Sequence, residues 1–234
     1  MKIRAVIALF LIVDIAIAAG YFLLPPGAFA NPGFEKKAAI ETPRRMGALA
    51  AAPNTLTEWP PTLGAQFPKV ALTDHDGRPF TFESLRGRPV LVEFVAMTCA
   101  ACQAWSGAHN YGVYEGLAAQ AGLKSIEEYY RQFTNGLDLF DGKIAFVQLV
   151  VYDTALAAPS RESLTAWRKH FHFDQHRSVF VVTGGEPLCN SESFKRTPGF
   201  ALLDREGVMR FEALGHTPRH NLYTELLAGV RPLL

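Results

Sequence analysis

Three stretches of the chain are nearly free of polar residues, at positions 90–96, 144–152 and 179–182. Apolar runs without alternation are typical of parallel strands that are covered on both faces. Between the second and third runs, residues 160–171 carry apolar side chains at helical spacing. The pattern therefore predicts the order strand, strand, helix, strand within an α/β domain.

Shorter segments on either side predict two hairpins. One pairs residues 69–72 with residues 79–81, and the other pairs residues 199–203 with residues 208–213. Each pair encloses a short polar turn that contains Asp and Gly, which favour tight turns. The hairpins add antiparallel strands, so the domain is expected to have a mixed sheet.

Further helices are predicted from cap residues. One begins at Cys99, is interrupted at residues 110–112 and resumes over residues 113–121. A capping box begins a second helix, which spans residues 125–133. Thr217 followed by Pro218 predicts a last helix over residues 217–229, because threonine is a good N-cap and proline suits the first helical position.

The first residues of the chain predict export. Lys2 and Arg4 precede a run over residues 5–24 that is apolar except for Asp14. This segment is either a cleaved secretory signal or a membrane anchor: residues 28–30 (Ala-Phe-Ala) fit a cleavage site, and the length of the run favours an anchor. In both cases the basic end stays in the cytoplasm. We therefore expect a periplasmic protein that is membrane-anchored or secreted.

Composition divides the rest of the chain into two parts. Residues 31–63 are rich in Pro and Ala without a sustained apolar period, which predicts a tether after the signal or anchor at residues 1–30. Residues 64–234 have the patterns of one domain. The chain has 23 Lys and Arg against 22 Asp and Glu. This near-neutral balance gives no argument for a nucleic-acid partner, and none is expected.

Cys99 and Cys102, just after the first apolar run, are the main candidates for chemistry. A helix N-terminus favours the thiolate of the first cysteine. A thiolate attacks disulfides, and the second cysteine can resolve the mixed disulfide that forms. Structural zinc and an inert core pair are the alternatives, but the only other cysteine is Cys189. We expect no metal and no other cofactor.

Two segments carry a resemblance to a known family. LRGRPVLVEFVAMTCAAC at residues 85–102 resembles the redoxin signature of TlpA-like periplasmic thioredoxins, and TPGFALLDREG at residues 197–207 resembles their later signature, a cis-proline strand that ends in Asp-x-x-Gly. The resemblance covers residues 64–232. It implies a thioredoxin-like fold, a central mixed sheet flanked by helices, here with an N-terminal hairpin extension and a helical insertion at residues 122–136.

The resemblance also implies an activity and a set of site residues. The activity is thiol–disulfide exchange with protein thiols and disulfides, with a membrane reductant or oxidant as a further partner. Glu93 stands where this family has a buried acid that passes protons to and from the second cysteine; a solvent-exposed glutamate at a strand end is the alternative. Pro198 is expected in the cis form close to Cys99. Thr98 and Thr197 are expected to contact the substrate.

Several features depart from this family. Thr98 replaces its usual tryptophan, and Ala100 and Ala101 replace its usual proline between the cysteines. Residues 163–184 resemble Sco-type copper chaperones, although Arg196 falls near the place of the histidine that those proteins use. A Sco-like copper-binding chaperone for cuproprotein assembly and a thiol peroxidase are therefore the alternative functions.

The remaining candidates are a third thiol and two histidine pairs. Cys189 is either an unpaired loop cysteine or a third redox thiol. His172 with His176 and His216 with His220 have a spacing that would place both rings on one face of a helix. Both pairs lie at predicted helix ends, so solvated loop and cap histidines are expected.

Overall fold

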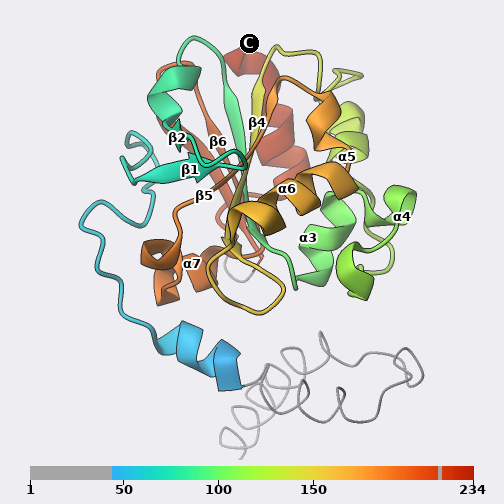
Figure 1. Ribbon diagram of the computed structural model, residues 1–234. Coiled ribbons are helices and arrows are strands. Elements are labelled where there is room, and N and C mark those ends of the chain that lie inside the picture. Colours follow the sequence, from blue (N-terminus) through green and yellow to red (C-terminus); the bar gives the residue numbers. More distant parts are fainter. Residues whose placement is uncertain (1–43, 216–217) are drawn as a thin grey trace, which may run out of the picture. The chain divides into compact units, whose positions relative to one another are not determined.

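The apolar runs form the centre of a mixed sheet in the computed structural model, which describes residues 44–215 and 218–234 (Figure 1). Within these residues the strand order is β2-β1-β5-β4-β3-β6-β7. β3 is parallel to β4, and β4 to β5, whereas β6 is antiparallel to β3 and β7 to β6. The strands are β1 (Leu72–Asp74), β2 (Pro79–Phe80), β3 (Val90–Ala96), β4 (Ala145–Tyr152), β5 (Val179–Thr183), β6 (Gly199–Leu203) and β7 (Met209–Leu214).

From β1 onward, helices lie in most of the connections between the strands and after β7. They are η1 (Phe82–Leu85), α3 (Ala100–Trp105), α4 (Ala108–Tyr111), η2 (Tyr114–Gly116), α5 (Ile126–Phe133), α6 (Arg161–His170), η3 (Phe173–Gln175), η4 (Glu186–Leu188), α7 (Ser191–Arg196), η5 (Leu222–Leu227) and η6 (Ala228–Leu233). The sheet order, the two parallel connections through helices and the antiparallel β6–β7 pair make the fold thioredoxin-like. The β1–β2 hairpin is its N-terminal extension.

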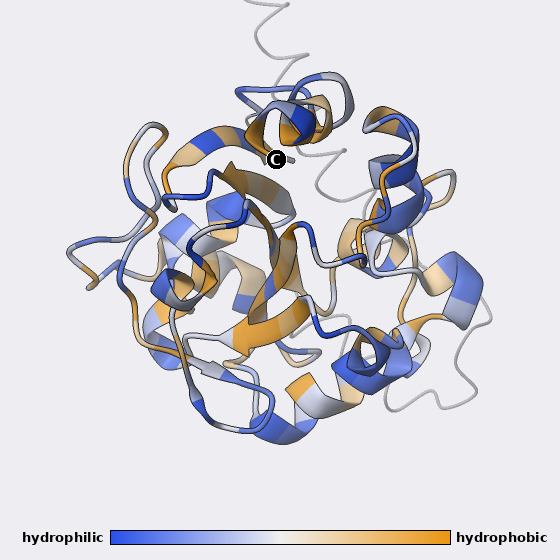
Figure 2. Cartoon of the chain, turned by 90° about the horizontal axis from the view of Figure 1, so that it is seen from above, coloured by the Kyte–Doolittle hydropathy of each residue, from blue (hydrophilic) through white to orange (hydrophobic). Residues whose placement is uncertain are grey.

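The sheet has a separate apolar core on each face. One core joins the sheet to α3, α5, α6 and the C-terminal η5 and η6. The other joins it to η1, to η4 and to residues that precede β1. Figure 2 shows the hydrophobic strands in the interior and hydrophilic stretches on the surrounding helices. Burial on both faces explains why β3 and β4 read as continuous apolar runs.

Part of the expected tether belongs to the folded domain. Residues 44–51 are helical, and Trp59 is only 3% exposed, with its ring edge-on to Phe67 and Phe94. The domain therefore extends toward the N-terminus beyond the boundary at residue 64 that composition suggested. Composition missed this because one buried aromatic residue carries no periodic pattern.

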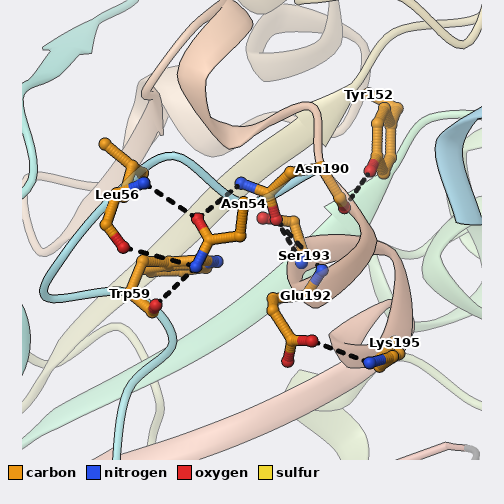
Figure 3. A network of polar contacts seen from close by, with 8 residues as sticks. All are labelled: Asn54, Leu56, Trp59, Tyr152, Asn190, Glu192, Ser193 and Lys195. Carbon is orange, nitrogen blue, oxygen red and sulfur yellow. Dashed lines mark hydrogen bonds and ion pairs between the residues drawn. The ribbon is translucent and has the colours of Figure 1, made fainter. Parts of the chain in front are cut away.

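A polar network holds this N-terminal segment to the loop before α7 (Figure 3). The Asn54 side chain donates to the carbonyl oxygen of Trp59 at 2.7 Å and accepts from Asn190 at 3.4 Å. Asn190 is also the N-cap of α7, and its carbonyl oxygen accepts from the Tyr152 hydroxyl at 3.0 Å. The two asparagines thus connect the segment, the end of β4 and the start of α7.

Two helix predictions need correction. The helix after Cys99 breaks at Gly107, where φ is 107°, and residues 113–121 contain only the short η2 instead of a resumed helix. The last helix begins at Leu222 with Asn221 as its N-cap, whereas it was predicted to begin at Pro218. The Asn221 carboxamide accepts two backbone N–H groups and so satisfies the start of that helix.

Other boundaries agree with the sequence. Ser125 caps α5 by accepting from the N–H of Glu128, as the capping box predicts. The expected signal or anchor at residues 1–30 lies outside the described residues, as does the proposed cap Thr217. Within residues 44–215 and 218–234, no helix is both long enough and apolar enough to cross a bilayer.

Candidate active site

Cys99 lies at the N-terminus of α3, one turn beyond the end of β3. It is the N-cap of the helix, and its Sγ accepts from the backbone N–H of Cys102 at 3.3 Å. The thiol is free and partly exposed to solvent. A sulfur at this place is open to an approaching substrate, and the helix N–H groups favour its thiolate.

Cys102 lies one turn further along the same helix and is completely buried. Its Sγ lies 3.9 Å from the carbonyl oxygen of Phe94 in β3, and its thiol is also free. The two cysteines therefore differ in access, since solvent reaches Cys99 and does not reach Cys102.

The surroundings also separate the two thiols electrostatically. A hydrogen bond from the Cys102 side chain, helped by the backbone N–H groups of Cys102 and Ala101, lowers the pKa of Cys99. Burial raises the pKa of Cys102 well above the ordinary value, and the charges of Cys99 and Glu93 raise it further. The arrangement therefore places the thiolate on the accessible sulfur and the proton on the buried one.

Glu93 lies in the middle of β3 and is completely buried, so the alternative of an exposed strand-end glutamate is wrong. Burial raises the pKa of Glu93 to about 8, although a hydrogen bond from Gln148 opposes the shift. A carboxyl group with such a pKa exchanges protons near neutral pH. It lies close enough to both cysteines for its charge to act on them.

Gln148 is a site residue that the sequence analysis did not identify. It is directly paired with Glu93 across the parallel β3–β4 ladder, and its Nε2 donates to Glu93 Oε2 at 2.8 Å. Gln148 Nε2 also donates to Ser106 Oγ at 2.9 Å, and Gln148 Oε1 accepts from Trp167 Nε1 at 2.8 Å. The sequence signal that could have found this pair is one polar residue in each of two apolar runs, Glu93 in residues 90–96 and Gln148 in residues 144–152.

Thr197 and Pro198 lie directly before β6, joined by a cis peptide bond as predicted. Gly199 is paired with Phe94 in the antiparallel β3–β6 ladder. Pro198 therefore lies beyond the end of this ladder, at the end of the sheet where β3 leads into Cys99. Thr197 is buried, whereas Pro198 is partly exposed.

Thr98 adjoins the cysteine pair in the chain, whereas Cys189 follows η4, far along the chain from the pair. Thr98 is partly buried in the turn between β3 and α3, next to Cys99. Cys189 is a free, partly exposed thiol after η4, with Sγ 3.5 Å from the carbonyl oxygen of Val151. Burial raises the pKa of Cys189 to about 12, so it is protonated at neutral pH.

The described histidines form no metal site. His172 stacks on Tyr111 and His176 stacks on Phe140, while His216 lies outside the described residues. Across residues 44–215 and 218–234, no three His, Cys, Asp or Glu side chains are grouped as a metal would require. Arg196 was expected near the place of the histidine that Sco-type chaperones use. It forms an ion pair with Glu212 at 3.6 Å.

Comparison with known proteins gives structural likeness at low sequence identity. The thioredoxin domain of a thiol-disulfide oxidoreductase from Bacteroides vulgatus matches with 15% identity over 74% of this chain and 99% of that chain, at a TM-score of 0.45. A peroxiredoxin-like protein from Aquifex aeolicus matches with 9% identity over 76% and 91%, at a TM-score of 0.48. BsSco, a member of the Sco family of cytochrome c oxidase assembly proteins, matches with 14% identity over 72% and 93%, at a TM-score of 0.45. No family model and no curated protein sequence matches the chain.

Proposed function

We propose that this protein is an exported thiol–disulfide oxidoreductase that exchanges disulfides with protein thiols through Cys99 and Cys102. The observation that carries the proposal is the contrast between the two sulfurs. Cys99 is accessible and accepts the N–H of Cys102, whereas Cys102 is completely buried one helical turn away. An attacking thiol has to be accessible to the substrate, and a resolving thiol has to lie next to it and be shielded from solvent.

The reaction begins when the Cys99 thiolate attacks one sulfur of a substrate disulfide. A Cys99–substrate bond forms, the substrate disulfide breaks, and the other substrate sulfur leaves as a thiolate. Cys102 then gives its proton to the Glu93 carboxylate and attacks Cys99 Sγ. A Cys99–Cys102 disulfide forms, and the second substrate sulfur leaves. Two electrons have passed to the substrate, and every step can run in reverse to oxidise a substrate dithiol.

Pro198, Thr197 and Thr98 are assigned to the substrate groove. Pro198 and Thr197 lie at the end of the sheet from which Cys99 follows, and Thr98 is next to Cys99 in sequence. A backbone segment at this place can pair with an extended substrate as an added strand. The apolar N-terminal run supports export, with the domain anchored to the membrane or released by cleavage.

The test is a single-turnover reaction between the reduced protein and a protein that contains a disulfide. We expect two substrate thiols to appear for each Cys99–Cys102 disulfide that mass spectrometry detects. Cys102→Ser should accumulate a mixed disulfide at Cys99, because the resolving thiol is missing. Iodoacetamide should label Cys99 of the reduced protein before Cys102.

Three outcomes would contradict the proposal. The first is full exchange activity in Cys99→Ser, and the second is labelling of Cys102 before Cys99. The third is an absence of exchange in a protein that binds one Cu(I) tightly or consumes hydrogen peroxide, which would favour the copper-chaperone or the peroxidase function. Cys189→Ser serves as the control, because its thiol lies outside the pair.

A further inference from the structure

The Gln148 side chain has a hydrogen-bond arrangement that allows only one orientation. Trp167 Nε1 is solely a donor, so the Gln148 atom that faces it at 2.8 Å is the amide oxygen. The amide nitrogen must then face the opposite way, toward Glu93 Oε2 and Ser106 Oγ. All these side chains are buried, so water does not offer the amide alternative partners.

This orientation makes the two oxygens of Glu93 unequal. Oε2 accepts the N–H of Gln148, and a proton placed on Oε2 would meet that donor. Oε1 is buried and has no hydrogen-bond partner among the described residues. The carboxyl proton is therefore directed to Oε1, where it remains free to leave.

We propose that Gln148, held by Trp167, is a positioning residue that fixes the Glu93 carboxyl group and assigns its exchangeable proton to Oε1. The inference rests on the proposed function, because the proton that Oε1 receives is the one that Cys102 loses. The hydrogen-bond partners of Gln148 are Glu93, Ser106 and Trp167. Gln148 acts through the carboxyl group, by donating to Oε2 in the charged state.

The donor also sets the pH at which Glu93 changes charge. A hydrogen bond to the ionised form favours that form, so Gln148 lowers the pKa that burial raises. The titratable groups that face Glu93 are Cys99 and Cys102 of α3; its partners in β4 and β6, Gln148 and Phe200, are uncharged. Replacing both cysteines by serine leaves Glu93 as the group to be titrated.

The experiment follows the carboxyl carbon of Glu93 by NMR in protein labelled with ¹³C-glutamate, in a Cys99→Ser/Cys102→Ser background. Its signal is assigned by its loss in Glu93→Gln. We expect Gln148→Met, which keeps the volume and removes the donor, to move the Glu93 midpoint upward by about one to two pH units. Trp167→Phe should move it in the same direction by less, because the amide remains but can turn.

Gln103→Met is the matched control. Gln103 is also completely buried, but its amide bonds to the carbonyl oxygen of Met97 and the N–H of Tyr114. The Gln103→Met substitution removes a buried amide that is not bonded to Glu93, so the titration midpoint of Glu93 should not change. An unchanged midpoint in Gln148→Met, or an equal shift in Gln103→Met, would overturn the proposal.

A second measurement separates this inference from the proposed function. With both cysteines present, the rate at which Cys102 resolves a mixed disulfide should rise with pH through the Glu93 midpoint. In Gln148→Met the rate profile should move upward with that midpoint, which supports both proposals. A shifted midpoint with an unmoved rate profile would support the control of Glu93 by Gln148 and overturn the role of Glu93 in exchange.

Discussion

The two faces of the central strands β3 and β4 carry different kinds of side chain. On one face of β3, Glu93 lies between Leu91 and Val95, which belong to the core beneath α3 and α6. On the other face, Val92 and Phe94 belong to a core closed by residues before β1. The period of two along β3 thus divides a stretch of uniform burial into a face with an ionisable carboxyl group and a face without one.

In the two central strands, β3 and β4, the buried polar side chains lie on the face that packs beneath α3. In β4, Gln148 lies on the Glu93 face, whereas Val147 and Leu149 face the other core. The polar pair lies beneath α3, which carries Cys99 and Cys102. We infer that the opposite face supplies stability, and that the α3 face gives up some stability to keep a carboxyl group near two thiols.

The largest effect on stability is expected from the face of β3 opposite Glu93. Trp59→Ala should lower the free energy of unfolding by about 3–5 kcal/mol, because it empties a buried aromatic site against Phe67 and Phe94. The order of alkylation, Cys99 before Cys102, should not change in the folded variant. Urea denaturation and mass mapping of labelled cysteines measure the two quantities.

Tyr111→Ala is the control for loss of an aromatic ring at the surface. Tyr111 is 45% exposed, so its removal should cost less than about 1 kcal/mol. If folded Trp59→Ala loses the preference for alkylation at Cys99, the core around Trp59 also controls the reactivity of the cysteine pair. If the two variants lose equal stability, the N-terminal segment is not part of the core.

A smaller effect on stability, but a large one on rate, is expected from Glu93→Gln. The amide keeps the shape and removes the titrating proton, so exchange should slow by roughly 10²-fold or more at pH 8 if general acid–base catalysis is lost. Single-turnover exchange with a disulfide protein measures the rate. A rate equal to that of the parent would show that Glu93 does not move the proton.

The same variant tests the linkage between Glu93 and stability. The pKa of Glu93 rises from its ordinary value of 4.5 to about 8 on folding. The folded protein therefore binds more protons than the unfolded chain between these values, and its stability falls as pH rises through this window. Relative to Glu93→Gln, the parent should lose roughly 1.4 kcal/mol per pH unit.

Denaturation at pH 5 and at pH 8 measures this difference. Glu212→Gln is the matched control: Glu212 is a buried glutamate of β7 that pairs with Arg196 and Arg219. Its replacement removes the carboxylate from beside the largely buried Arg196 guanidinium, so stability should fall at both pH values. A parent whose stability relative to Glu93→Gln does not change with pH would contradict the burial of an ionisable Glu93.

The sequence predicted the elements whose patterns are local. β3 follows its apolar run from residue 90 to residue 96, and α5 follows its capping box. The Asn221 cap and the break at Gly107 were missed, because Pro218 and Asn110 gave competing local signals. Burial of Trp59 depends on contacts with Phe94, far along the chain, and no local pattern encodes it.

In the candidate site too, residues with a local sequence signal were found and residues that depend on distant contacts were missed. Cys99 and Cys102 were identified from spacing, and Glu93 from a resemblance, since one residue in one strand has no periodic signature. Gln148 was missed because its role depends on the register between β3 and β4 and on the Trp167 indole of α6. Strand register and helix packing decide which polar residues meet, and a single sequence specifies neither directly.

The smallest effect is expected from Cys189→Ser, which tests whether the third thiol takes part in exchange. Cys189 packs against the core on the sheet face opposite Glu93, with its Sγ 3.5 Å from the carbonyl oxygen of Val151. Its raised pKa, about 12, leaves almost no thiolate at neutral pH. A serine hydroxyl can donate to the same carbonyl oxygen, so the free energy of unfolding should change by less than about 1 kcal/mol. The exchange rate should equal that of the parent in the single-turnover assay. A slower rate with unchanged stability would make Cys189 a third redox thiol and would place chemistry on the sheet face opposite Glu93.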